Sequence, residues 1–156
     1  LDFLFGNIAY FKNKRINRLW EFESNKGNCP NPFKIPHTSL FIKKKVLEFL
    51  KLYDEGFIIS SDTDFLIKLS KNNFRYKKLD TYLIFMKSGG LSFSSSNFFT
   101  KVLEDLSILF KYYDFSFLFF YIYKVLIKFS GFLLFTNKKK LSIVQKQYLL
   151  NISKNN

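Results

Sequence analysis

The chain has 156 residues, of which 47% are hydrophobic and 24% charged, so it is not a disordered protein and can bury one ordinary core with an appendage. The formal net charge is +13, but lysines supply nearly all of it, and the arginines that read bases and phosphates are scarce, so we expect no nucleic-acid partner. Cys29 is the only cysteine, which excludes a disulfide within the chain.

The first residue is Leu1 rather than methionine, and a run of strand-forming residues begins almost at once. Phe3 to Phe11 is aromatic and aliphatic except at Gly6 and Asn7, which predicts a strand. It lacks the basic segment, apolar segment and small-residue cleavage site of a signal peptide. We therefore expect the chain to begin inside a longer polypeptide.

A polar stretch follows this strand and is not predicted to form a regular element. Asn25 to Pro36 then contains all three prolines of the chain, which fix φ and prevent helix continuation. This segment is predicted to be an ordered loop leading to His37. The short apolar run from Leu40 to Ile42 is predicted to be a strand.

Helices and extended segments alternate over the next fifty residues, as is typical of an α/β domain. In chain order the predicted elements are a helix over Lys45 to Leu52, an extended run over Phe57 to Ile59, a helix capped by Ser60 or Ser61, a strand over Phe74 to Met86 and a turn over Ser88 to Gly90.

The character of the chain changes after the serine-rich link from Ser92 to Ser96. Apolar residues recur every three or four positions from Phe99 to Tyr113, which predicts an amphipathic helix. A second helix is predicted over Phe115 to Phe135, whose length is close to the ~20 residues that cross a bilayer.

Two lysines, Lys124 and Lys128, interrupt this second helix on one side. Placing each at the centre of a membrane costs about 2.5 to 3.5 kcal/mol, which disfavours a span. Three alternatives stay open: the helix lies in the membrane interface, packs on the rest of the protein, or spans the membrane. The run from Lys138 to Lys140 either meets anionic lipid head groups or is simply solvated.

Two segments contain the residues best suited to chemistry, because the sequence has no Walker-type loop, Cys/His metal cluster or G-x-S-x-G turn. One is His37 with its neighbours, and the other is Asp62-Thr63-Asp64. In an extended segment these two carboxylates point to the same side and can share a divalent cation, whereas in a helix they diverge by about 200°. Alternatively, Ser61 caps a helix and Asp64 completes a capping box.

Four motifs occur in this order: Pro36-His37-Thr38-Ser39-Leu40-Phe41, Tyr53-Asp54-Glu55, Ser60-Ser61-Asp62-Thr63-Asp64-Phe65 and Ser88-Gly89-Gly90-Leu91-Ser92. In type, order and spacing they resemble one branch of the family 2 glycosyltransferases, bacterial enzymes that build O-antigen and capsular polysaccharides. The resemblance covers Asp2 to Ser92. Two positions depart from the family pattern: Tyr53 replaces the usual Phe, and Thr63 stands where an aromatic residue is common.

The resemblance implies an α/β fold: residues 1–95 form the acceptor-side half of a partial GT-A-like, Rossmann-like domain, and residues 96–156 form a helical C-terminal tail. Asp62 matches the acid that serves as catalytic general base. His37, Asp64, Gly89 and Gly90 are expected to bind substrate. A divalent metal, Mg or Mn, is expected in the complete enzyme, but its ligands belong to a nucleotide-binding half that no part of this chain matches.

The expected function is inverting transfer of a sugar from a nucleotide-sugar donor to a cell-surface glycan or lipid-linked acceptor. The expected location is cytoplasmic, peripheral at the inner face of the plasma membrane. The alternative is a non-catalytic basic module that docks on a membrane surface, in which Asp62 only caps a helix.

Overall fold

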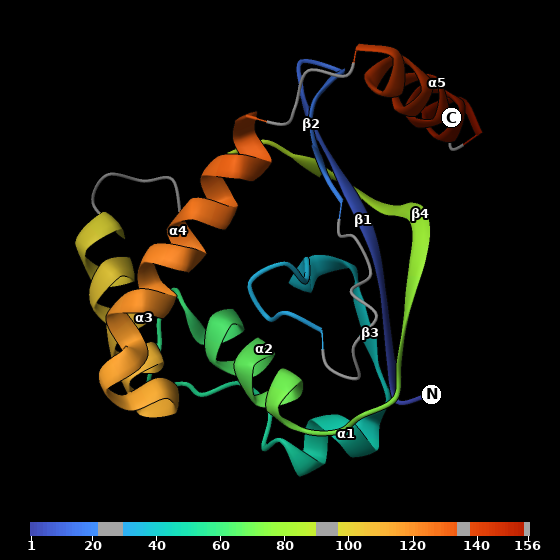
Figure 1. The fold of residues 1–156 in the computed structure, drawn as a ribbon. Helices are drawn as coiled ribbons and strands as arrows, with labels where there is room; N and C mark the ends of the chain where they lie inside the picture. Colours follow the sequence, from blue (N-terminus) through green and yellow to red (C-terminus); the bar gives the residue numbers. More distant parts are fainter. Residues whose placement is uncertain (22–29, 90–96, 134–137, 155–156) are drawn as a thin grey trace.

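The computed structural model describes residues 1–21, 30–89, 97–133 and 138–154, and the sheet at its centre is organised around β1 (Phe3–Lys12) (Figure 1). β4 (Tyr76–Lys87) pairs with β1 in parallel from Phe3 to Phe11. β2 (Arg15–Trp20) and β3 (Leu40–Ile42) pair with β1 antiparallel, β2 near its end and β3 near its start. Since β4 occupies one edge of β1 along nearly its whole length, β2 and β3 share the other edge.

β2 corrects one prediction, because the polar stretch after the first strand is itself a strand. Asn13 and Lys14 both have positive φ, 50° and 59°, and form a tight two-residue turn that sends the chain back along β1. Such turns usually contain Asn-Gly or Asp-Gly, so the lysine hides the signal. Ile16 is the only fully buried residue of β2, which explains why the strand lacks an obvious apolar alternation.

The main core lies between the first half of β1 and two helices, α1 (Lys44–Phe49) and α2 (Ser61–Lys71). Both helices were predicted, with α1 ending three residues earlier than expected. Its buried residues are Phe3, Phe5, Ile35, Val46, Leu50, Phe65, Leu66 and Leu69. The extended run predicted over Phe57 to Ile59 is wrong: those residues form turns and bends, and their backbone bonds elsewhere, as described below.

The helical part of the chain packs onto the α/β part. α3 (Phe98–Tyr113) and α4 (Phe117–Leu133) lie side by side, joined by the short 3-10 turn η4 (Asp114–Ser116) (Figure 1). Together with α2 they bury a second cluster containing Phe33, Ile67, Ile108 and Leu109. The amphipathic helix and the long apolar helix were therefore predicted correctly as elements.

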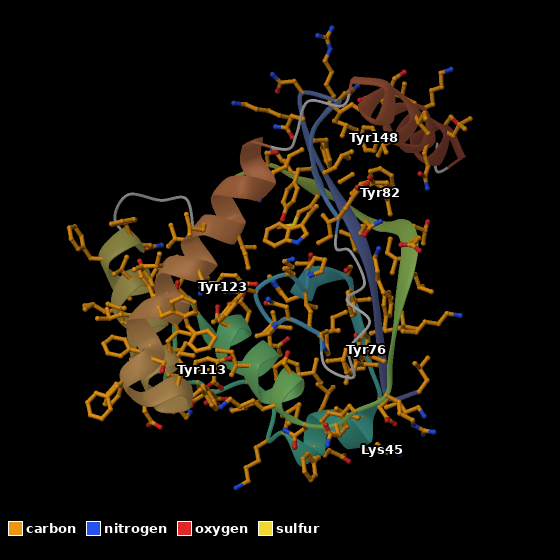
Figure 2. All side chains as sticks on the ribbon, viewed as in Figure 1. Lys45, Tyr76, Tyr82, Tyr113, Tyr123 and Tyr148 are labelled. Atoms are coloured by element: carbon orange, nitrogen blue, oxygen red, sulfur yellow. The ribbon has the colours of Figure 1, made fainter. Side chains whose placement is uncertain are left out.

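α5 (Lys138–Lys154) lies apart from the other helices, across the end of the β1–β2 hairpin (Figure 1). It buries Val144 and Tyr148 against Ala9 and Ile16, and the ring of Tyr148 lies 5.0 Å from that of Phe11. Figure 2 shows Tyr148 on this side of the sheet, near Tyr82 of β4. The sheet therefore has helices at both ends: α1 and α2 at its start and α5 at the hairpin.

None of the described helices has the length and apolar character that a membrane span requires. α4 packs on the protein with its lysine side inward: Lys124 is 4% exposed, whereas Leu118 and Ile122 face outward. The side chain of Lys128, Cys29 and the link from Ser92 to Ser96 lie outside the described residues.

Candidate functional site

His37 begins the 3-10 turn η1 (His37–Ser39), and Ser39 fastens this turn to β1. The Ser39 hydroxyl, which is fully buried, donates to the carbonyl of Gly6 (2.6 Å) and accepts the Gly6 N–H (3.3 Å). Pro36 precedes the turn in an extended conformation, with φ −78°, which its ring favours. The Pro-His-x-Ser order thus fixes the backbone of a histidine whose own side chain stays 45% exposed.

The imidazole of His37 meets the carboxylate of Asp62, which lies in the first turn of α2. Nδ1 of His37 and Oδ2 of Asp62 are 3.3 Å apart, and the Asp62 side chain is 34% exposed. Oδ1 of Asp62 accepts the backbone N–H of Thr63 at 2.7 Å. The structure therefore brings together two residues that the sequence singled out separately, and it leaves their polar atoms open to solvent.

Tyr53 lies beside this pair. Its ring centroid is 4.7 Å from that of Phe65, in the turn of α2 after Asp62. Burial, and secondarily the negative charge of Asp62, raise the pKa of the Tyr53 phenol. The phenol therefore stays protonated and can serve as a hydrogen-bond donor near the carboxylate.

Asp64 is placed very differently from Asp62. Its side chain is fully buried, with Nζ of Lys68 at 2.6 Å, Nζ of Lys111 at 3.2 Å and the hydroxyl of Tyr112 at 2.8 Å. Because the string is helical, its two carboxylates point apart and do not form a shared cation site. The groups around Asp64 tie α2 to α3, and they occupy the carboxylate that was predicted to bind substrate.

The predicted capping box is wrong in its details. The residue that precedes α2 is Ser60, not Ser61, and no side chain caps the helix start by a hydrogen bond from that position. The free backbone groups of this turn are bonded by α3 instead.

Gly89 lies away from the His37–Asp62 pair. It follows Ser88, whose N–H bonds the carbonyl of Phe11 and whose hydroxyl is 2.9 Å from the side chain of Asn17, at the hairpin end of the sheet. Phe11 is five residues along β1 from Gly6, to which Ser39 is tied, or about 16 Å at the usual rise of a strand. Gly89 has a φ of +104°, so a turn there needs glycine. Gly90 lies outside the described residues.

Glu104 of α3 holds the segment that leads into α2. Its two carboxylate oxygens accept the backbone N–H groups of Ile58 (2.8 Å), Ile59 (2.9 Å) and Ser60 (2.8 Å). Desolvation opposes the charge of Glu104, but these three donors outweigh it and lower its pKa. The sequence pattern did not reveal this role, because a carboxylate that bonds backbone leaves no signature in spacing.

The neighbouring Asp105 forms a buried ion pair with Lys124 of α4. Nζ of Lys124 is 2.7 Å from Oδ1 of Asp105 and 3.1 Å from the hydroxyl of Thr63, and both charged side chains are below 10% exposed. Lys101 lies 3.8 Å from the same carboxylate. A signal for this cluster existed: Asp105 stands on the buried face of α3 with Ile108 and Leu109, where a charge requires a partner.

We expect Glu104→Gln to lower the free energy of unfolding by about 1 to 2 kcal/mol at pH 7, because the amide accepts fewer of the three N–H groups and carries no charge. The pKa of Glu104 is lowered from 4.5 in the folded state, so its contribution is complete above that pH and declines as the pH falls through the folded value. Urea unfolding at pH 7 and in acid should show the gap to the unmodified chain narrowing. A gap of the same size at both pH values would contradict this role of the carboxylate.

Among the described residues, no group of three or more His, Cys, Asp or Glu side chains is arranged to hold a metal ion. The metal expected from the resemblance therefore finds no set of ligands in this part of the chain. Comparison of the chain with protein-family models, with curated proteins and with solved structures found no match. The geometry of the described residues is thus the basis for any functional conclusion.

Proposed function

We propose that this chain is the acceptor-side half of an inverting glycosyltransferase with a GT-A-like domain, and that Asp62 is its general base. The observation that carries the proposal is the contact between His37 and Asp62, 3.3 Å apart and both partly exposed. The resemblance of the four motifs supports the same assignment from the sequence. The two lines of argument are independent, since residues 25 positions apart need not meet in space.

The proposed reaction needs a carboxylate at this place. A sugar hydroxyl is a weak nucleophile until its proton is removed during attack on the anomeric carbon. The acceptor oxygen forms the new bond to that carbon, the bond to the donor's diphosphate breaks with its electron pair leaving on the diphosphate, and the acceptor proton passes to Asp62. His37, with its Nδ1 proton facing the carboxylate, keeps Asp62 oriented toward the acceptor.

The position of Asp62 depends on its surroundings more than on its own helix. Glu104 holds the three backbone N–H groups before α2, and Lys124 reaches Thr63 directly after Asp62. A carboxylate supported on both sides in this way has little freedom to move, which favours catalysis by a fixed base. A divalent metal, when bound to the other half of the enzyme, would stabilise the leaving diphosphate.

The first test compares the chain alone with a complete polypeptide in which a nucleotide-binding half precedes it. We expect residues 1–156 alone to transfer no sugar from any nucleotide-sugar, because the donor and metal sites belong to the other half. Release of nucleoside diphosphate, followed with a panel of donors, is the measurement. Turnover by the chain alone contradicts the half-enzyme assignment, and a folded complete polypeptide that transfers no sugar contradicts the enzymatic proposal itself.

A non-catalytic membrane-docking module is the second candidate, and one observation favours it. Apolar side chains of α3 and α4 face outward, among them Phe99, Leu103, Phe115 and Phe119, which are 75%, 68%, 95% and 68% exposed. Exposed apolar surface of this kind marks interaction sites. This candidate, however, assigns no role to the contact between His37 and Asp62. A complete polypeptide that binds vesicles but transfers no sugar would favour it.

A further inference from the structure

The excess positive charge of the chain is concentrated in two segments. Residues 11–20 and 138–154 contain nine of the 25 basic residues and none of the 12 acidic ones, so the rest of the chain is close to balanced. In the α2–α3–α4 region, by contrast, the lysines pair with Asp54, Asp64 and Asp105. The net charge of +13 is therefore not spread evenly as a by-product of composition.

The fold brings these two segments together. Residues 11–20 form the tip and second strand of the β1–β2 hairpin, and α5 packs across that hairpin (Figure 1). Gln145 of α5 fixes the contact: its side-chain oxygen accepts the N–H of Ile16 at 2.6 Å, and its amide donates to the carbonyl of Lys14 at 3.0 Å. Lys87, at the end of β4, lies opposite Phe11 and adds another exposed basic residue at this end.

This cationic end of the molecule is also apolar in places. On α5 the residues Ile143, Lys146 and Leu150 follow one another at helical spacing on the face opposite the buried Val144 and Tyr148, and all three are exposed. An open hollow separates α5 from the hairpin tip, and Lys14, Arg15 and Leu149 are among its lining residues. Basic side chains interspersed with exposed aliphatic ones match an anionic bilayer, which offers phosphate head groups above acyl chains.

We propose that the hairpin tip and α5 form a docking surface for an anionic lipid membrane. Nucleic acid fits this surface less well, because exposed aliphatic side chains contribute nothing to backbone binding and no exposed aromatic side chain is available here, among the described residues, to stack on bases. The inference does not depend on the role of Asp62. It assigns the membrane contact to the hairpin end of the sheet and not to α4.

The test is cosedimentation of the full 156-residue chain with vesicles of phosphatidylglycerol and phosphatidylcholine in equal parts, and with pure phosphatidylcholine. We expect binding to the anionic vesicles only, and release at high salt. The variant Lys12→Glu/Arg15→Glu/Lys146→Glu changes exposed side chains only, and we expect it to lower the partition coefficient by about 100-fold. Replacing the exposed Ile143 and Leu150 with Ser should weaken binding that persists at moderate salt.

The matched control changes the net charge by the same amount elsewhere, through Lys43→Glu, Lys51→Glu and Lys77→Glu, three exposed residues at the other end of the sheet. The control should bind almost as well as the unmodified chain. Equal loss in both triple variants would overturn the proposal, because net charge alone would then be responsible. So would loss of binding on replacing Leu103 and Phe119 of the α3–α4 face, or tight binding of single-stranded RNA without binding to vesicles. Circular dichroism and urea midpoints verify that each variant is folded.

Discussion

Replacing Asp62 with Asn in the complete enzyme is expected to lower the rate of sugar transfer by about 10² to 10⁴, the loss that follows removal of a general base. Asn has nearly the same size as Asp and still accepts the N–H of Thr63 through its side-chain oxygen, as Asp62 does at 2.7 Å. The local structure should therefore survive while the proton acceptor disappears. The measurement is the initial rate at saturating donor and acceptor, together with donor affinity, which should stay the same.

The matched control for this change is Asp64→Asn, two residues further along the same helix. Asp64 is fully buried between Lys68, Lys111 and Tyr112, so its loss should reduce stability by about 1 to 3 kcal/mol and affect the rate only modestly below the unfolding temperature. If Asp64→Asn abolishes metal-dependent donor binding while Asp62→Asn remains active, the string is a metal site and the family assignment is wrong.

The largest effect on stability is expected from Lys124→Ala. This change leaves the carboxylate of Asp105 buried without its closest cation, which costs about 3 to 5 kcal/mol for a buried pair. Burial opposes ionisation of Asp105, but Lys124 and Lys101 outweigh it and lower the pKa of the carboxyl. The pair's contribution is therefore complete above the unfolded pKa of Asp and is lost as the pH falls through the lower folded value. Urea unfolding at pH 7 measures the cost directly.

Two further variants separate the loss of a pair from the loss of packing. Lys124→Met/Asp105→Leu removes both charges and keeps most of the volume, so it should recover most of the stability lost in the single variant. Lys44→Ala breaks an ion pair with Glu48 at 3.6 Å, where the lysine is 88% exposed, and should change stability by less than about 0.5 kcal/mol. A double variant as unstable as Lys124→Ala would show that packing, not charge, is responsible.

Strong apolar periodicity allowed most elements to be predicted from the sequence. α3 and α4 follow from apolar residues at helical spacing, and β1 from an aromatic and aliphatic run. β2 was missed because its turn contains Asn13-Lys14 and its outward residues are charged. The run Phe57 to Ile59 was taken for a strand because its apolar residues were counted without knowing that Glu104 would bond its backbone.

For the candidate site, the sequence identified the residue types but not their arrangement. His37 and Asp62 were singled out individually, yet only the packing of η1 against β1 and of α2 against the core shows that they touch. Asp64 was expected to bind substrate, and its burial depends on Lys111 and Tyr112 from a helix some fifty residues later. Contacts over such separations depend on tertiary packing, which local pattern does not encode.

The pairing of β1 with β4 has a consequence for how the chain reaches its native state. β1 is the central strand, but its parallel partner is separated from it by more than sixty residues. That ladder must pay the entropy of closing a long loop before its hydrogen bonds form, whereas the β1–β2 hairpin and the helices close locally. On the ribosome, one edge of β1 waits without a partner until β4 has been synthesised. During this interval an aromatic-rich strand presents an unpaired edge, and the chain is most exposed to association with other copies of itself.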